Sequence, residues 1–298
     1  MKNDLKYLQI KISDRIRNTY YRFRNWQWSN RNTQKTTTRK PPGSYNLVFH
    51  EDFSNFNQEP INTNNWRWGH PWGNIHADQL WRYWPKRLDP LAQVVYKCYE
   101  GLALELRRIP RTFRKLDQPK WLQKKLPQEW RPTWATGLIS SRESWQWGWF
   151  EATIKLPTEV GMWSAFWLMG EEGWPPEIDI FEAYTDQDPH SIRVCPNVHY
   201  KVNGVKGDAG ASSVSIKSPE ERWVQYACHW KPNKIKIYYD GQLAWTCNDP
   251  EIMASMARKQ YIILNNGCKD PEVTGNEPRE SAMLVKEVKV YQPNEWMN

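Results

Sequence analysis

Residues 177–182 read EIDIFE, an alternation of acidic and apolar side chains that is typical of a β-strand with two unlike faces. Residues two apart on a strand share a face, so Glu177 and Asp179 point the same way. In a regular strand Glu182 would point to the opposite, apolar face, where an unpaired carboxylate is costly. One extra residue between Asp179 and Glu182, inserted as a β-bulge, would return Glu182 to the acidic face. The stretch therefore predicts a bulged strand with three carboxylates in a row.

Three carboxylates in this order have a chemical use. A glycosidase that retains the anomeric configuration needs two carboxyl groups about 5–5.5 Å apart, one as nucleophile and one as acid/base. Glu177 and Glu182 can lean together to such a gap, and Asp179 between them can share a proton with one of them. Neighbouring carboxylates also disfavour ionising together, so one pKa rises. The alternative interpretation is an ordinary strand with a solvated acidic face.

The rest of the chain from Tyr45 onward also has the pattern of β-structure. Alternating apolar runs cover residues 149–156, 163–169 and 223–230. Residues 234–245 form two such runs around Asp240-Gly241, which is a strong hairpin signal. Many short strands separated by turns predict an all-β sandwich or barrel.

Tryptophan is unusually frequent, at 20 of 298 residues. Aromatic rings with a polar edge suit the apolar faces of sugar rings, and they also fill the core of a sandwich. A single tryptophan fits either role, but so many together favour a carbohydrate-binding site.

The net charge of +8 is unevenly distributed along the chain. Residues 1–42 hold eleven Lys or Arg and two Asp, whereas the remainder holds 30 basic and 31 acidic residues. The pattern over 3–24 predicts a basic amphipathic helix, and 29–43 has linker composition, ending in Pro-Pro-Gly. We therefore expect a leader and linker over 1–43 and one domain over 44–298. We expect the basic leader to bind an anionic surface or assembly, and the alternative is a helix packed on its own domain.

The first residues, MKNDLKYLQI, show neither an uninterrupted apolar stretch nor a small-residue cleavage site. The chain as given thus carries no recognisable secretory signal. It also lacks the ~18 apolar residues in a row that a membrane helix needs. We expect a monomer without a transmembrane segment, cytoplasmic or particle-associated unless another route exports it.

The carboxylate strand and its flanks resemble glycoside hydrolase family 16, the group of laminarinases, agarases and carrageenases. EIDIFE is similar to the E-x-D-x-x-E signature of its bulge-type members. The flanking segments that also resemble the family are 144–157 (SWQWGWFEATIKLP), 161–169 (GMWSAFWLM), 197–200 (NVHY), 227–243 (ACHWKPNKIKIYYDGQL) and 261–267 (YIILNNG). The resemblance runs from about Leu47 to Tyr291, which is nearly the whole body without the leader.

The resemblance implies a concanavalin-like jelly roll of two curved antiparallel sheets with a concave substrate cleft. It implies a retaining endo-glycosidase without a cofactor, with Glu177 as nucleophile, Asp179 as its helper and Glu182 as acid/base. The substrate would be a β-linked polysaccharide, with β-glucan preferred and a galactan as the alternative. The implied substrate-binding residues are Trp145, Trp163, Trp167, His199 and Asn265. A non-catalytic carbohydrate-binding or structural protein on the same sandwich is the competing interpretation.

The sequence departs from the family pattern in two places. Many relatives bind a structural calcium partly through an Asp in the last strand, where MLVKEVKVY places Lys286. A lysine cannot ligate a hard cation, so we expect no metal there. The basic, proline-containing stretch over 107–131 is longer than expected, and we interpret it as a surface loop within reach of the substrate.

Overall fold

The computed structural model describes residues 38–54, 61–71, 75–76, 79–80, 94–108, 134–185, 191–211, 213–217, 222–268 and 278–296. The helix predicted over 3–24 and nearly all of the basic stretch over 107–131 lie outside these residues. Within the described part of the chain, no helix is long and apolar enough to cross a membrane.

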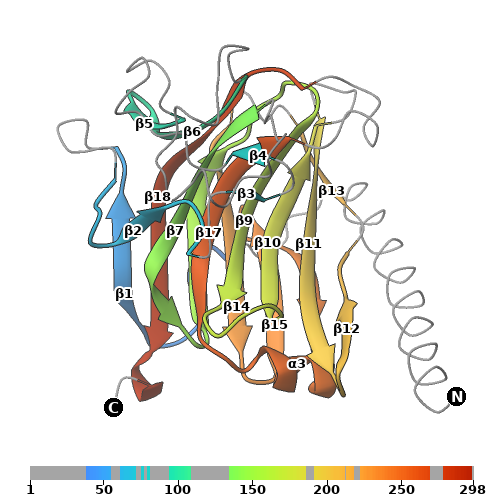
Figure 1. The fold of residues 1–298 in the computed structure, drawn as a ribbon. Coiled ribbons are helices and arrows are strands. Elements are labelled where there is room, and N and C mark those ends of the chain that lie inside the picture. The colour runs from blue at the N-terminus through green and yellow to red at the C-terminus, as the bar shows by residue number, and fades with distance from the viewer. Residues whose placement is uncertain are drawn as a thin grey trace, which may run out of the picture.

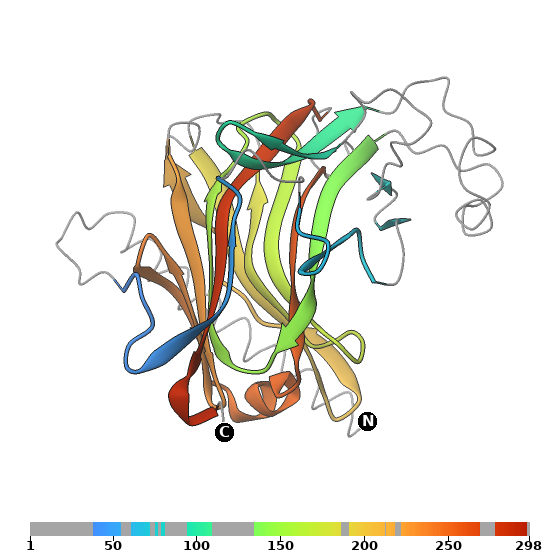
Figure 2. The same cartoon turned by 90° about the vertical axis from the view of Figure 1, so that its left-hand side faces the viewer.

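The fold is a jelly roll of two curved antiparallel sheets, shown in two views in Figures 1 and 2. The front sheet contains β2 (Trp66–Trp68), β7 (Trp134–Trp145), β17 (Gln260–Cys268), β9 (Met162–Gly170), β10 (Glu177–Tyr184) and β11 (Ser191–Val202), with β12 (Val205–Asp208) and β13 (Val214–Lys217) paired to β11. The back sheet contains β5 (Val95–Cys98), β6 (Gly101–Arg108), β18 (Ser281–Pro293), β1 (Tyr45–Asp52), β8 (Gly148–Lys155), β14 (Val224–Lys231), β15 (Lys234–Tyr239) and β16 (Gln242–Cys247). The predicted all-β architecture is confirmed.

Smaller elements complete the described fold. The short strands β3 (Ile75–His76) and β4 (Gln79–Leu80) pair with each other, and β4 makes one parallel pairing with β7. A short helix, α3 (Pro250–Met256), precedes β17, and a 3-10 turn, η4 (Asn294–Trp296), follows β18. The first residues of β7 pair with β6 and the rest pair with β17, so this one long strand joins the two sheets.

Alternation along each strand separates a core face from an outward face. In β8, Phe150 and Ile154 are buried between the sheets, while Glu151 and Thr153 point outward. We call the outward face of the front sheet the front face and that of the back sheet the back face. The main core lies between the sheets and includes the fully buried Trp66, Trp230 and Trp245, so several tryptophans are structural.

The predicted Asp-Gly hairpin connects β15 and β16. Asp240 and Gly241 have φ values of 48° and 74°, the left-handed conformation that a tight two-residue turn requires at both positions. The segment that precedes β1 contacts this turn: the Thr38 N–H donates to the Gly241 carbonyl at 2.7 Å, and Gln225 donates to the Arg39 carbonyl at 3.0 Å. Residues 38–43, predicted as linker, therefore contact the body.

Candidate active site

Strand β10 carries the three acidic residues on the front face, between β9 and β11. Its register pairs across β9 are Glu177–Met169, Asp179–Trp167, Glu182–Ala165 and Tyr184–Trp163. The four β9 partners alternate along that strand and therefore share one face. The register shifts between Asp179 and Phe181 against β9, and between Asp179 and Glu182 against β11. The predicted bulge is confirmed, and it places Glu182 on the face of Glu177 and Asp179.

The bulge also satisfies the apolar residues of the strand. Ile178, Ile180 and Phe181 are each fully buried in the core between the sheets. Because Ile180 and Phe181 are consecutive, a regular strand would expose one of them on the front face. The extra residue lets both side chains enter the core while the chain returns to register at Glu182. The burial of these two residues thus favours the same bulge that aligns the carboxylates.

Glu177 and Asp179 form a coupled pair of carboxyl groups. Burial, with Asp179 as the next contribution, raises the pKa of Glu177 to about 9, and His199 opposes this shift. Asp179 is 2% exposed, and burial followed by the charge of Glu182 raises its pKa well above the usual range. The two side chains share a hydrogen bond. The pair therefore holds a proton near neutral pH.

Glu182 lies at the other end of the acidic row and is only partly buried. The indole N–H of Trp163 donates to its Oε1 at 2.8 Å. The Tyr184 hydroxyl, two residues along the strand, is hydrogen-bonded to the same carboxylate. Trp163, predicted as a substrate-binding residue, thus contacts the carboxylate that is predicted as the acid/base.

His199 on β11 lies directly opposite Glu177 in the strand register. Its Nε2 is 3.4 Å from an oxygen of Asp179 and 3.6 Å from one of Glu177. The amide nitrogen of Asn197 is 3.3 Å from the same Nε2. The structure therefore brings His199 to the acidic row, where the sequence predicted it.

Trp167 and Asn265 also lie on the front face, but beneath its surface. Trp167 is 9% exposed, donates its indole N–H to Asn265 Oδ1 at 2.8 Å, and packs edge-on against His70. Asn265 itself is 2% exposed. The two residues lie beside the acidic row, because β9 pairs Trp167 with Asp179.

Trp145 does not lie at the site, and its prediction as a substrate-binding residue is wrong. It pairs with Gln260, is 3% exposed, and packs in the main core between Phe49 and Phe150. Ile139, six residues earlier on β7, lies in the same core, so Trp145 follows the regular alternation of its strand.

Trp174 is a site residue that the sequence analysis missed. It lies in the turn between β9 and β10, with 45% of its surface exposed and its ring centroid 5.8 Å from that of His199. Its indole is hydrogen-bonded to Glu177, and the Lys206 ammonium lies 4.3 Å from its ring centroid. Its place three residues before Glu177, in a Trp-Pro-Pro turn, was the available signal.

Among the described residues, one group has the spacing of a metal site. One ligand atom from each of Glu177, Asp179 and His199 lies within 4.8 Å of the others. Lys286, at the predicted calcium position, is exposed in a bulge of β18, with its ammonium 6.0 Å from the Trp223 ring centroid.

The sequence and the fold are similar to those of known proteins. Residues 93–264 match the family model described as glycosyl hydrolases family 16. An endo-1,3-1,4-beta-glycanase of Rhizobium meliloti is 27% identical over 135 residues, which cover 44% of this chain and 27% of that protein. A galactan endo-beta-1,3-galactanase of Flammulina velutipes is 65% identical over 26 residues, which cover 9% of this chain and 10% of that protein.

A solved structure extends the likeness to nearly the whole body. The crystal structure of SCLam, a non-specific endo-beta-1,3(4)-glucanase, superposes with a TM-score of 0.66 at 23% identity and covers 87% of this chain and 95% of that one. At this identity the likeness shows the fold. The Rhizobium match, by contrast, spans only about a quarter of that protein's length.

Proposed function

Because the chain belongs to glycosyl hydrolase family 16, we propose that it is a retaining endo-glycosidase that hydrolyses a β-linked polysaccharide. The observation that carries the proposal is the bulge between Asp179 and Glu182, which places both glutamates and the aspartate on the front face. Retaining hydrolysis uses two carboxyl groups with different protonation states that flank the scissile glycosidic bond. The acidic row offers such a pair.

In the proposed mechanism Glu177 is the nucleophile and Glu182 the acid/base. Glu182 protonates the glycosidic oxygen while Glu177 attacks the anomeric carbon, and a glycosyl ester forms on Glu177 as the leaving sugar departs. Glu182, now ionised, then takes a proton from a water molecule that attacks the ester and frees Glu177.

The role of Asp179 follows from the shared proton. Glu177 must be ionised to attack, although burial and its acidic neighbour raise its pKa to about 9. Asp179 is the more deeply buried partner, so it is the better place for the proton of the pair. A protonated Asp179 donates its hydrogen bond to an ionised Glu177 and orients it. His199, whose Nε2 is 3.6 Å from a Glu177 oxygen, opposes the rise in the pKa of Glu177 and so favours its ionised form.

For the substrate we propose a β-glucan, with a β-galactan as the alternative. The Rhizobium relative and the SCLam structure carry β-glycanase and β-glucanase names, and their matches cover 44% and 87% of this chain. The match to the Flammulina galactanase is much shorter. Trp163 and the exposed ring of Trp174 flank the acidic row and offer aromatic surfaces for sugar rings.

The test is an assay of new reducing ends on purified β-1,3-glucan, mixed-linkage glucan and galactan. Product anomers followed by NMR from the first minutes should show retained configuration. The expected result is endo-cleavage of a β-glucan that persists in EDTA. Binding without cleavage in every preparation would instead support the non-catalytic interpretation, and inverted product would refute the nucleophile assignment.

A further inference from the structure

The carboxylate of Glu182 is held by two neutral donors from adjacent strands. Trp163 on β9 donates its indole N–H at 2.8 Å, and Tyr184 on β10 contributes its hydroxyl. The strand register places Tyr184 directly opposite Trp163, so the two donors lie side by side at one end of the acidic row. Burial and the nearby Glu182 raise the pKa of the Tyr184 hydroxyl, which therefore remains a donor at every pH of interest.

Other groups of the described residues also lie around Glu182. On β10, the charge of Glu182 contributes, after burial, to the raised pKa of Asp179. On β11, Cys195 lies opposite Glu182, and Arg193 lies opposite Tyr184 with its side chain exposed. On β9 the facing residue is Ala165, which has no polar side chain.

Resting on the assignment of Glu182 as acid/base, we propose that Tyr184 is a positioning residue. Together with Trp163 it holds the Glu182 carboxylate in place and sets the upper pH limit of catalysis. A general acid must be protonated to act, so kcat/KM falls once rising pH ionises it. Donors that bind the ionised carboxylate favour that form and lower this limit. The same donors keep the ionised carboxylate oriented for its second task, accepting a proton from water.

The experiment compares the pH profile of kcat/KM for full-length wild type and Tyr184→Phe on a soluble β-glucan oligosaccharide. The substitution removes one hydroxyl and keeps the ring. Losing one hydrogen bond to a charged group should move the alkaline limb upward by about one pH unit. Tyr238→Phe, on the back face, is the matched control and should leave the limb unchanged. An alkaline limb that stays in place or moves downward in Tyr184→Phe overturns the proposal.

Two further measurements separate this inference from the proposed function. Trp163→Phe removes the other donor, so its alkaline limb should also move upward, and this variant serves if Tyr184→Phe does not fold. Titration of Glu182 by carbon NMR, in substrate-free protein labelled at glutamate, should show the same upward shift without any assay of activity. If Glu182→Gln retains activity, the proposed function fails, whereas an unshifted Glu182 titration in active Tyr184→Phe overturns only the positioning role.

Discussion

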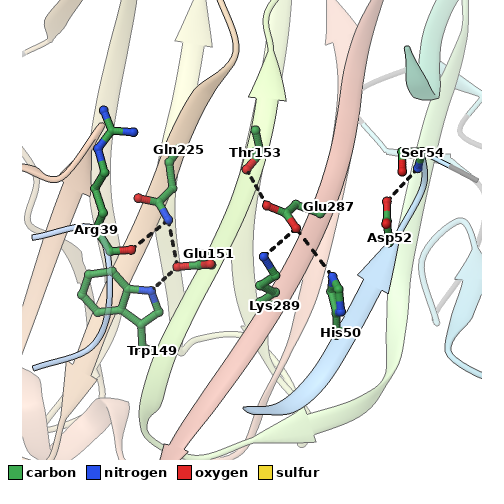
Figure 3. Close-up of polar contacts among 10 residues, drawn as sticks. All are labelled: Arg39, His50, Asp52, Ser54, Trp149, Glu151, Thr153, Gln225, Glu287 and Lys289. Atoms are coloured by element: carbon green, nitrogen blue, oxygen red, sulfur yellow. Dashed lines mark hydrogen bonds and ion pairs between the residues drawn. The ribbon is translucent and has the colours of Figure 1, made fainter. Parts of the chain in front are cut away.

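The two outward faces of the sandwich surround their glutamates with different neighbours. On each face a glutamate accepts an indole N–H: Glu182 from Trp163 at 2.8 Å in front, and Glu151 from Trp149 at 2.6 Å behind. On the back face Glu151 also accepts from Gln225, as Figure 3 shows. There each acidic residue has donors of its own.

The neighbouring carboxylate on the back face, Glu287, has basic side chains as partners. Glu287 is 2.6 Å from the Lys289 ammonium and 3.5 Å from His50 (Figure 3). On the front face, among the described residues, His199 lies beside Glu177 and Asp179, and burial followed by another carboxyl raises the pKa of each of the two. On the back face the carboxylate of Glu287 lies beside a lysine, whereas on the front face the carboxyl groups lie beside one another. Carboxyl groups with strongly shifted pKa values cluster at functional sites.

Removal of the bulge should cost the most stability. Deleting Ile180 would leave Glu177 and Glu182 four residues apart, so that a regular strand still places both on the front face. The deletion removes one fully buried side chain from the core and should cost about 3 kcal/mol, with activity retained in the folded variant. Ile180→Val keeps the bulge and should retain activity with a loss of about 1 kcal/mol. Urea unfolding and the reducing-end assay measure both effects, and loss of activity in a folded deletion variant would contradict the view that the bulge serves only to restore the face of Glu182.

Neutral isosteres on the two faces should differ in activity by orders of magnitude. Glu177→Gln and Glu182→Gln each remove a group that must attack or transfer a proton, so kcat should fall by ~10³-fold or more. Glu151→Gln on the back face is the matched control and should keep kcat within about twofold. Kinetics on purified variants with unchanged circular dichroism decide the matter. Near wild-type kcat in either front-face variant would refute the catalytic assignment.

The pH dependence of stability should have opposite signs on the two faces. The folded-state pKa of Glu177 is raised from 4.5 to about 9, so folded protein binds more protons and loses stability as pH rises across that window. Glu177→Gln removes this loss and should be increasingly more stable than wild type up to pH ~9.

Glu287 should behave in the reverse manner. Burial works against its ionisation, but the hydrogen bond and charge of Lys289 outweigh burial and lower its pKa below 4.5. Its stabilisation is therefore present above the unfolded-state value and is lost as pH falls through the lower folded-state value. Thermal unfolding of Glu287→Gln should show a deficit at neutral pH that closes in acid. Parallel pH trends for the two variants would contradict the contrast between the faces.

The smallest effect is expected from the leader. Deleting residues 1–37 should leave catalysis on a short soluble substrate unchanged, because the acidic row lies on the front face. Deleting 1–43 also removes the contacts of Thr38 and Arg39 with the hairpin and should cost about 1–2 kcal/mol. Binding of the full chain to anionic vesicles should fall steeply with salt and be lost in both truncations. Loss of activity in the shorter truncation would place the leader within the catalytic domain.

Features fixed by local pattern were accessible from the sequence. The bulge was predicted because a regular strand would turn Glu182 toward the apolar face, and the hairpin because Asp240-Gly241 is a strong turn signal. Tyr184 was also within reach, since it lies two residues from Glu182 on the same face. The position of Trp145 was not, because alternation alone does not show which face of β7 lies toward the core between the sheets.

Burial inside the front face was equally hidden. Trp167 was predicted as a substrate-binding residue, yet it is largely buried and His70 packs against its ring. Sequence alternation distinguishes the two faces of a sheet, but it does not show which outward residues are covered by a distant loop. The order of the acidic residues and the face that they share were therefore predictable, whereas the burial of the neighbouring residues was not.

The bulge on β10 also has an evolutionary reading. A bulge is one residue, and one residue is one codon, so a single in-frame loss of three nucleotides would shorten the spacing of Glu177 and Glu182 from five residues to four. On a regular strand residues four apart share a face, so the shorter strand would keep both glutamates on its working face. A lineage on this scaffold can thus gain or lose the bulge in one genetic event while the acidic row is retained.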